Sequence, residues 1–299
     1  MALYPGANVP YDRVSMRTST LALLALTLAP AVATAKPKVQ NNPSTTASGG
    51  KVGQTCGVKV LPLAVGNTWT YMNVASPTPA LPDVARIAPQ PPKTFTITVK
   101  SIDAKAGDTV VSLEEKVTYD LTKDPKKPVT DIRTINSTIT CNAKNKFDIS
   151  PDSFFFAGEP GGYLGLTFDA FDRKGTSWQL TAGAFGDKEW PEDITAHWTQ
   201  TPSKDSEAKL NAGKLEIERR TSPSAAETVV TKAGTYQAEK IVIKTTGRIT
   251  LQNPKSKDLK PAEMPADWLN QMWFADGYGV VQSLNRYAHE YQLVDSQLK

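Results

Sequence analysis

A period-two alternation of apolar and polar residues is the feature that most constrains what this chain can fold into. Residues 111–120 place apolar side chains on one face of an extended strand and polar side chains on the other, and Glu115 is the one polar residue on the apolar face. Residues 95–100 alternate in the same way, and the turn residues 106–108 separate the two runs, which predicts a β-hairpin. The apolar face of its second strand consists of Val111, Leu113, Val117 and Tyr119.

The same pattern recurs to the end of the chain. At most a short helix is expected, starting near Pro265, because proline suits the first helical position. Many strands with turn residues between them predict a mainly β fold with little helix: an antiparallel curved sheet, a half-barrel or a sandwich. The further strands are expected at 132–142, 194–199, 228–231, 235–244, 272–275, 280–284 and 286–294.

Two segments depart from the strand pattern. Residues 75–93 hold six prolines, which exclude a central strand and predict a stiff surface loop. Residues 154–185 are rich in glycine and aromatic residues, and we expect a loop that covers an apolar surface.

The first 35 residues predict an export leader. Met16 and Arg17 precede an apolar run, and Ala33 and Ala35 form an A-x-A site, so translation is expected to start at Met16 and cleavage to follow Ala35. The apolar run is shorter than the ~20 residues of a membrane-spanning helix, so no transmembrane anchor is expected. The division is then a leader at 1–35, a flexible linker at 36–56 and one β domain at 57–299. The expected location is periplasmic or extracellular, in a bacterium.

Cys56 and Cys141 are the two cysteines of the chain. Disulfides form and persist in exported proteins, and no close Cys-x-x-Cys spacing points to a redox role, so we expect a structural disulfide between them.

Composition and motifs point away from most chemistry. The net charge of +4 is small and its basic groups are interrupted, so no nucleic-acid partner is expected. The two histidines, at 197 and 289, do not have the spacing of a metal site, and we expect no metal, no cofactor and no enzymatic activity. Acidic pairs at 114–115 and 192–193 leave a hydrolase acting on cell-wall or polysaccharide material as a further alternative.

Three stretches resemble exported bacterial proteins of unknown function. The opening PLAVGNTWTY, at 62–71, is similar to their P-L-x-x-G-N-x-W-T-Y element, AGTYQAEKI, at 233–241, to their A-G-T-F-x-A-x-x-V element, and WFADGYGVV, at 273–281, to their W-Y-A-P-G-V-G-L-V element. The resemblance implies an antiparallel half-barrel of the kind seen in lipoprotein carriers, and it implies no activity.

These observations favour a non-enzymatic envelope protein that binds an apolar or lipid-like ligand in a curved β cradle. The alternative is a surface or extracellular-matrix interaction module without a small-molecule ligand. The oligomeric state and the envelope component that could act as partner stay open. The ligand-binding candidates are Phe154, Phe155, Phe156, Tyr163, Trp178, Tyr287, His289 and Tyr291.

Overall fold

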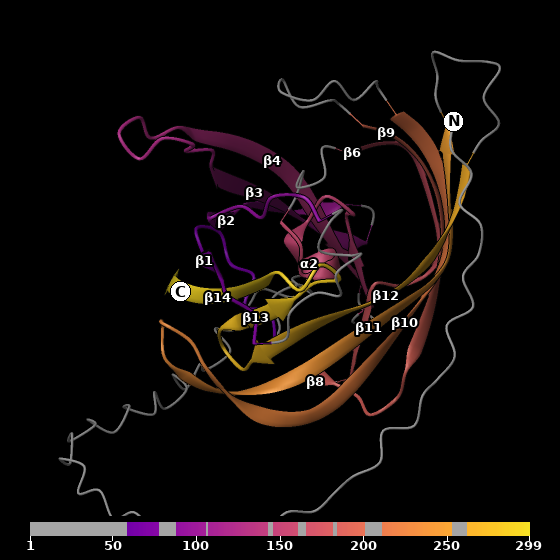
Figure 1. The fold of residues 1–299 in the computed structure, drawn as a ribbon. Coiled ribbons are helices and arrows are strands. Elements are labelled where there is room, and N and C mark those ends of the chain that lie inside the picture. The colour runs from indigo at the N-terminus through magenta and orange to yellow at the C-terminus, as the bar shows by residue number, and fades with distance from the viewer. Residues whose placement is uncertain are drawn as a thin grey trace, which may run out of the picture. The chain divides into compact units, whose positions relative to one another are not determined.

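In the described part of the chain, the fold is one antiparallel, curved sheet whose ends do not pair with each other, with one short helix on its inner side (Figure 1). The computed structural model describes residues 59–77, 88–105, 107–142, 146–160, 166–181, 184–200, 211–252 and 262–299. Within them the strands are β1 (Thr68–Val74), β2 (Thr94–Lys105), β3 (Asp108–Asp120), β4 (Thr130–Cys141), β5 (Lys146–Ile149), β6 (Leu166–Gly175), β7 (Trp178–Thr181), β8 (Ala184–Phe185), β9 (Trp190–Gln200), β10 (Asn211–Val230), β11 (Thr235–Gln252), β12 (Ala262–Ala275), β13 (Gly279–Leu284) and β14 (Glu290–Gln297); the helix is α2 (Phe154–Ala157).

Their order across the sheet is β6-β9-β10-β11-β12-β13-β14-β1-β2-β3-β4-β5-β7-β8. Neighbours in sequence are mostly neighbours in space, as expected of strands joined by tight turns. The predicted mainly β, antiparallel curved sheet is confirmed, and so are the hairpins β2–β3, β10–β11 and β12–β13. Among the described residues no helix is long and apolar enough to span a membrane.

Three local predictions are wrong. The segment 154–185 is not one loop, because it contains α2, β6, β7 and β8. Pro265 starts no helix; it lies within β12, opposite Arg248 of β11. The last strand begins at Glu290 and not at 286, because Ala288 adopts a left-handed conformation (φ 58°) that interrupts the extended chain.

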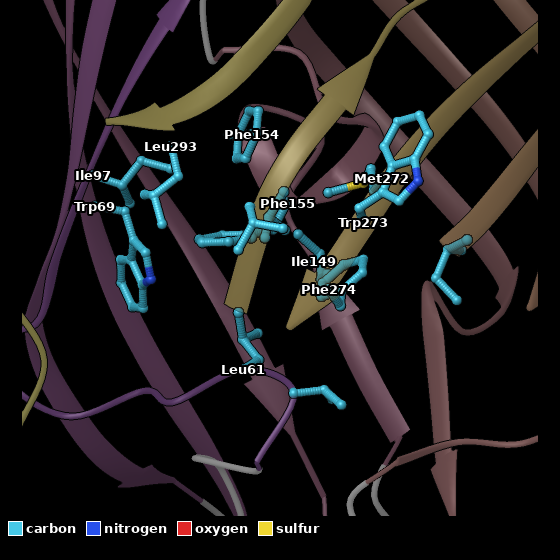
Figure 2. Close-up of a cluster of buried hydrophobic side chains, with 14 of the residues drawn as sticks. Leu61, Trp69, Ile97, Ile149, Phe154, Phe155, Met272, Trp273, Phe274 and Leu293 are labelled. Carbon is cyan, nitrogen blue, oxygen red and sulfur yellow. The ribbon is translucent and has the colours of Figure 1, made fainter. Parts of the chain in front are cut away.

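The main core lies between the inner face of the sheet and α2 (Figure 2). Phe154 and Phe155 are completely buried there. The Phe155 ring contacts Trp69 edge-on at a centroid distance of 5.8 Å, and the Phe154 ring lies 4.7 Å from Tyr71. The aromatic side chains of α2 therefore occupy the part of the inner face that we expected a ligand to occupy.

The four-residue helix α2 is fixed at both ends by side chains from the sheet. Such a short helix is not stable alone, so these contacts decide its place. At its start Phe154 N donates to the buried carboxylate of Glu115 (2.7 Å), and Ser153 caps Phe155 N. At its end the carbonyl oxygens accept from three strands: Phe156 O from Arg219, Ala157 O from Asn270 and Gly158 O from Ser283.

The three motif stretches meet in the same core. Trp69 Nε1 donates to Tyr278 O (2.6 Å) and Tyr71 Oη to Val280 O (2.8 Å), so the first motif is hydrogen-bonded to the last. The rings of Tyr236 and Tyr278 join the second motif to the last, edge-on at 4.9 Å. These residues are explained by packing between the two ends of the domain.

Several sequence predictions fall outside the described residues: the leader 1–35, the linker 36–56 with Cys56, and Tyr163. In the proline-rich segment 75–93, the described positions, 75–77 and 88–93, form no strand, in agreement with the expected loop. Cys141 is fully buried at the end of β4. The Cys56–Cys141 disulfide stays a prediction.

Candidate ligand-binding face

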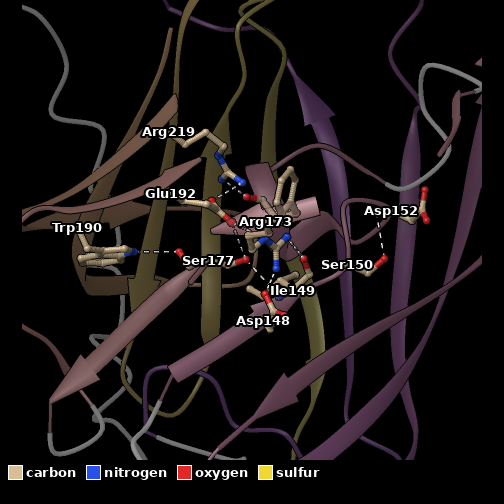
Figure 3. A network of polar contacts seen from close by, with 10 residues as sticks. Asp148, Ile149, Ser150, Asp152, Arg173, Ser177, Trp190, Glu192 and Arg219 are labelled. Atoms are coloured by element: carbon tan, nitrogen blue, oxygen red, sulfur yellow. Dashed lines mark hydrogen bonds and ion pairs between the residues drawn. The ribbon is translucent and has the colours of Figure 1, made fainter. Parts of the chain in front are cut away.

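A layer of buried charges crosses the inner face beyond α2 (Figure 3). The carboxylate of Glu192 lies between two arginines, with Oε1 2.6 Å from Arg173 Nε and Oε2 3.2 Å from Arg219 Nη1. The side chains of Glu192 and Arg219 are 2% and 3% exposed, so both ionic groups are shielded from bulk water. Arg219 also stacks on Phe156, with its guanidinium carbon 3.9 Å from the ring centroid. This polar layer is an integral part of the interior.

Arg173 joins two parts of the sheet that share no ladder. It lies on β6, its Nη2 donates to Ile149 O of β5 (2.7 Å), and its Nη1 pairs with Asp148. Ser177, in the corner between β6 and β7, accepts from Ile149 N (3.2 Å). Side chains therefore hold β6 against β5 where backbone pairing is absent.

Burial sets the protonation tendencies of the layer. Desolvation lowers the pKa of Arg173 to about 10, against the opposing effect of Glu192. Burial also lowers the pKa of Arg219, and both nearby glutamates oppose this. Arg173 remains cationic near neutral pH, since a guanidinium with a pKa of about 10 is still protonated there.

Beyond the polar layer, the same face of the sheet becomes apolar across five strands. The register aligns Phe171, Ala196, Leu215, Ile249 and Met264 in one row from β6 to β12. Four inter-strand spacings of ~4.8 Å make that row about 19 Å wide. We call this surface the distal face; it consists of Phe168, Phe171, Ile194, Ala196, Trp198, Leu215, Ile217, Ile249, Leu251, Met264 and Ala266.

The distal face is separate from the main core. Ile194, Ala196, Ile217 and Ala266 form a buried cluster of their own, and the half-buried Phe156 packs against both clusters. Phe168, Phe171, Leu215 and Ile249 are half-buried at the margin of that cluster. Met264 is 41% exposed. The face therefore keeps accessible apolar surface on the inner side of the sheet.

Two glycines shape this face. A Cβ at Gly213 would come within 2.4 Å of the Trp198 ring, so the missing side chain lets the indole lie over the backbone of β10. Gly247 has φ 143°, and a Cβ there would meet Glu216 O at 2.2 Å. Neither position accepts a side chain without local rearrangement.

The turn between β13 and β14 brings a further arginine to the edge of the distal face. The guanidinium carbon of Arg286 lies 4.4 Å from the Trp268 ring centroid and 4.8 Å from that of Tyr287. Trp268 packs against the distal cluster. Asn285 Oδ1 accepts from Tyr287 N and His289 N (3.0 Å each), which fixes the turn. The strained φ of Ala288 belongs to the same turn.

Glu159 is the acidic side chain that faces Arg286. Its Oε1 lies 3.7 Å from Arg286 Nε, which is beyond hydrogen-bond distance. Burial raises the pKa of Glu159, and Arg286, Asn270 and Arg219 oppose the rise. Burial raises the pKa of Tyr287 and lowers that of His289, whose rings lie 5.9 Å apart. Neutral imidazole is therefore the favoured form of His289 near pH 7.

The structure places the predicted ligand-binding residues in three settings. Those in the main core are completely buried and serve as packing residues; they are Phe154, Phe155, Trp178 and Tyr291. Phe156 lies between the core and the distal face. Tyr287 and His289 are half-buried in the β13–β14 turn, outside β14.

Sequence reasoning missed the residues of the distal face and its arginines. Glu115 and Glu192 belong to the acidic pairs noted above, and the structure buries both of them as structural partners. Arg219 could have been found, since it shares a strand phase with the apolar Ile217. An arginine on the buried face of a strand indicates a buried ion pair, but the acidic partner can be identified only from the three-dimensional structure.

Two other features of the described residues were candidates for a binding site, and neither has the size or the ligands of one. An open depression of about 150 Å³ is lined by polar residues at strand ends, among them Asp108, Lys146 and Asp148. It is smaller than the ~300–1,000 Å³ of typical ligand pockets. Within the described part of the chain, no group of three or more His, Cys, Asp or Glu side chains could hold a metal ion.

Comparison with known proteins gives distant structural neighbours. No family model and no curated protein matches the chain. One solved structure, "a putative lipoprotein from Parabacteroides distasonis", is 14% identical with a TM-score of 0.44, over 80% of this chain and 99% of that one. Another, "a putative exported protein with YmcC-like fold" from Bacteroides fragilis, is 12% identical with a TM-score of 0.36, over 79% of this chain and 97% of that one.

Proposed function

We propose that this protein is an exported, non-enzymatic envelope protein that binds an apolar, lipid-like ligand on the distal face. The observation that carries the proposal is the row from Phe171 to Met264, which is apolar on every one of five adjacent strands. A soluble domain usually places polar residues at accessible positions, and contiguous accessible apolar surface is typical of binding sites. The leader predicted at 1–35 supports export to the periplasm or the extracellular space.

The position of α2 decides which part of the inner face is open to a ligand. Hydrogen bonds hold the helix against β3, β10, β12 and β13, so the part of the inner face that α2 covers belongs to the main core. The polar layer ends that core with the paired Arg173, Glu192 and Arg219. An alkyl chain would lie beyond this layer, across β6 and β9–β12.

Straight-chain alcohols test the proposal, because they are uncharged and differ only in apolar length. Titration of the mature protein with the series from octanol to dodecanol, in competition with the fluorophore N-phenyl-1-naphthylamine, measures their affinities. Each buried CH₂ contributes ~0.8 kcal/mol, so the affinity should rise by up to about fourfold per carbon.

Two exposed apolar residues of β12 give a matched pair of variants. Met264 is 41% exposed on the distal face, and Leu269 is 50% exposed on the opposite face of the same strand, since their separation is odd. Met264→Lys should weaken dodecanol binding by at least about tenfold, because the ammonium group would be desolvated. Leu269→Lys should change it by less than about twofold. Equal effects, or no dependence on chain length, would favour the interaction-module alternative.

A further inference from the structure

The polar layer and the β13–β14 turn leave an unbalanced positive charge beside the distal face. The layer and the turn together hold three arginines, at 173, 219 and 286, and two glutamates, at 159 and 192; the Arg286 and Glu159 side chains are half-buried and the Glu192 and Arg219 side chains are buried. Asp148 also pairs with Arg173, but its side chain is 59% exposed and its charge is screened by water. The interior side of the layer therefore favours an anion.

Of the three arginines, Arg286 has the weakest acidic partner. Arg173 and Arg219 each contact Glu192 at 3.2 Å or less and also donate to a backbone carbonyl. The one acidic side chain paired with Arg286 in the described part of the chain is Glu159, at 3.7 Å. Among the described residues, the buried Arg286 Nε, Arg173 Nε and Arg219 Nη1 all lack a hydrogen-bond partner, but the latter two lie within 3.2 Å of the Glu192 carboxylate. The neighbouring Asn285 Nδ2 is also buried without a hydrogen-bond partner there. Buried donors without acceptors are costly, and an incoming acceptor would relieve that cost.

The surroundings of Arg286 fit an amphiphile. Its guanidinium contacts the Trp268 and Tyr287 rings, which orient it and exclude water from its faces. Trp268 is also in contact with the apolar cluster of the distal face, so a tail on that face would end close to Arg286. In the sheet register Trp268 follows Ala266 and Met264 along the same face of β12.

We propose that the ligand of the distal face carries an anionic head group, a carboxylate or a phosphate, and that Arg286 binds this group. This inference rests on the proposed function, because it assigns the head of the ligand whose tail lies on the distal face. The anion takes the place of Glu159 as the partner of Arg286. Burial raises the pKa of Glu159, so this carboxyl accepts a proton more readily than an exposed one when it is displaced.

Three ligands with the same tail distinguish the contribution of the head group to affinity from that of the tail. They are dodecanoate, dodecyl phosphate and the uncharged dodecanol. The mature protein should bind at least one of the two anions at least about tenfold more tightly than dodecanol, the size expected of a hydrogen bond to a charged group. The preferred anion then identifies the head as carboxylate or phosphate. If dodecanol binds as tightly as both anions, the head-group inference is overturned and the proposed function stands. If none of the three binds, the proposed function itself fails.

Variants test whether Arg286 binds the anionic head group. Arg286→Gln should remove the preference for the anion and leave dodecanol affinity within about twofold. Arg248→Gln, at a 59% exposed position of β11, serves as the control and should keep the preference.

Glu159→Gln removes the competing carboxylate, so it should raise affinity for the anion at least about threefold without changing that for dodecanol. This gain cannot arise from loss of folding, so it stays informative if Arg286→Gln proves unstable. A preference that persists in Arg286→Gln, or that falls in Glu159→Gln, would contradict the assignment.

Discussion

The internal position of α2 makes Phe155→Ala a sensitive test of the fold. Phe155 is completely buried, and its ring meets Trp69 at 5.8 Å, Phe154 at 5.6 Å and Trp178 at 6.4 Å, all nearly edge-on. Truncation to alanine removes these contacts and leaves a cavity that the sheet cannot close, because strands on both sides are held by hydrogen bonds to α2.

The expected loss is ~3–5 kcal/mol of unfolding free energy, the usual cost of deleting a buried phenylalanine side chain. For a domain of this size each kcal/mol shifts the melting temperature by about 2–4 °C, so a fall of about 6–20 °C is expected. Dodecanol affinity, measured well below the melting temperature, should stay within about twofold, since Phe155 belongs to the core and not to the distal face.

Urea unfolding followed by circular dichroism measures the free energy, and differential scanning calorimetry the melting temperature. Phe168→Ala is the matched control, because Phe168 is a half-buried phenylalanine of the distal face. It should cost less stability and weaken dodecanol binding more. If Phe155→Ala lost ligand binding but less than about 1 kcal/mol of stability, Phe155 would belong to a binding site and the described core would be wrong.

Three further outcomes concern the buried charges and the cysteines. Glu192→Gln should cost ~3–5 kcal/mol of unfolding free energy, measured with urea, because it leaves two buried arginines without their shared counter-ion. Glu189→Gln, at an exposed ion pair, should leave the unfolding free energy almost unchanged, and similar costs for both variants would argue against a buried layer. Because burial raises the pKa of Glu159 above 4.5, the folded state binds its proton more tightly than the unfolded state, so this residue's contribution to stability falls as pH rises from about 4.5 through the folded pKa. Between pH about 4.5 and the folded-state pKa, the slope of unfolding free energy against pH should therefore become less negative in Glu159→Gln. An unchanged slope would refute the raised pKa of Glu159. Thiol titration of the unfolded, unreduced protein should find no free thiol if Cys56 and Cys141 are paired, and removing the bond should cost ~4–5 kcal/mol; two free thiols would rule the pairing out.

The strands were predictable because their burial pattern is local. Val111, Leu113, Val117 and Tyr119 are buried as the alternation predicts, and Ile194, Ala196 and Trp198 share one buried face. Glu115 shows where the pattern stops. Its carboxylate lies on the inner face because it accepts a hydrogen bond from Phe154 N, which is 39 residues further along the chain.

The helix and the distal face were not predictable, for different reasons. The sequence FFFA of α2 has no helical period, and its conformation depends on side chains from four strands. The distal face is assembled from single residues on five strands, so no stretch of sequence displays it. Ahead of the final strand, the left-handed Ala288 interrupts the extended chain, so Tyr287 and His289 lie in the turn and not in β14.

Photolabelling would show where on the protein a lipid-like ligand binds. The mature protein is incubated with a long-chain fatty acid that carries a diazirine at the end of its tail, irradiated, digested and mapped by mass spectrometry. We expect labels on the distal-face side of β6 and β9–β12, centred on the row from Phe171 to Met264, and we expect them to be lost in Met264→Lys but not in Leu269→Lys. Labels concentrated on Leu269 and its face of the sheet, or no saturable labelling, would contradict binding on the distal face.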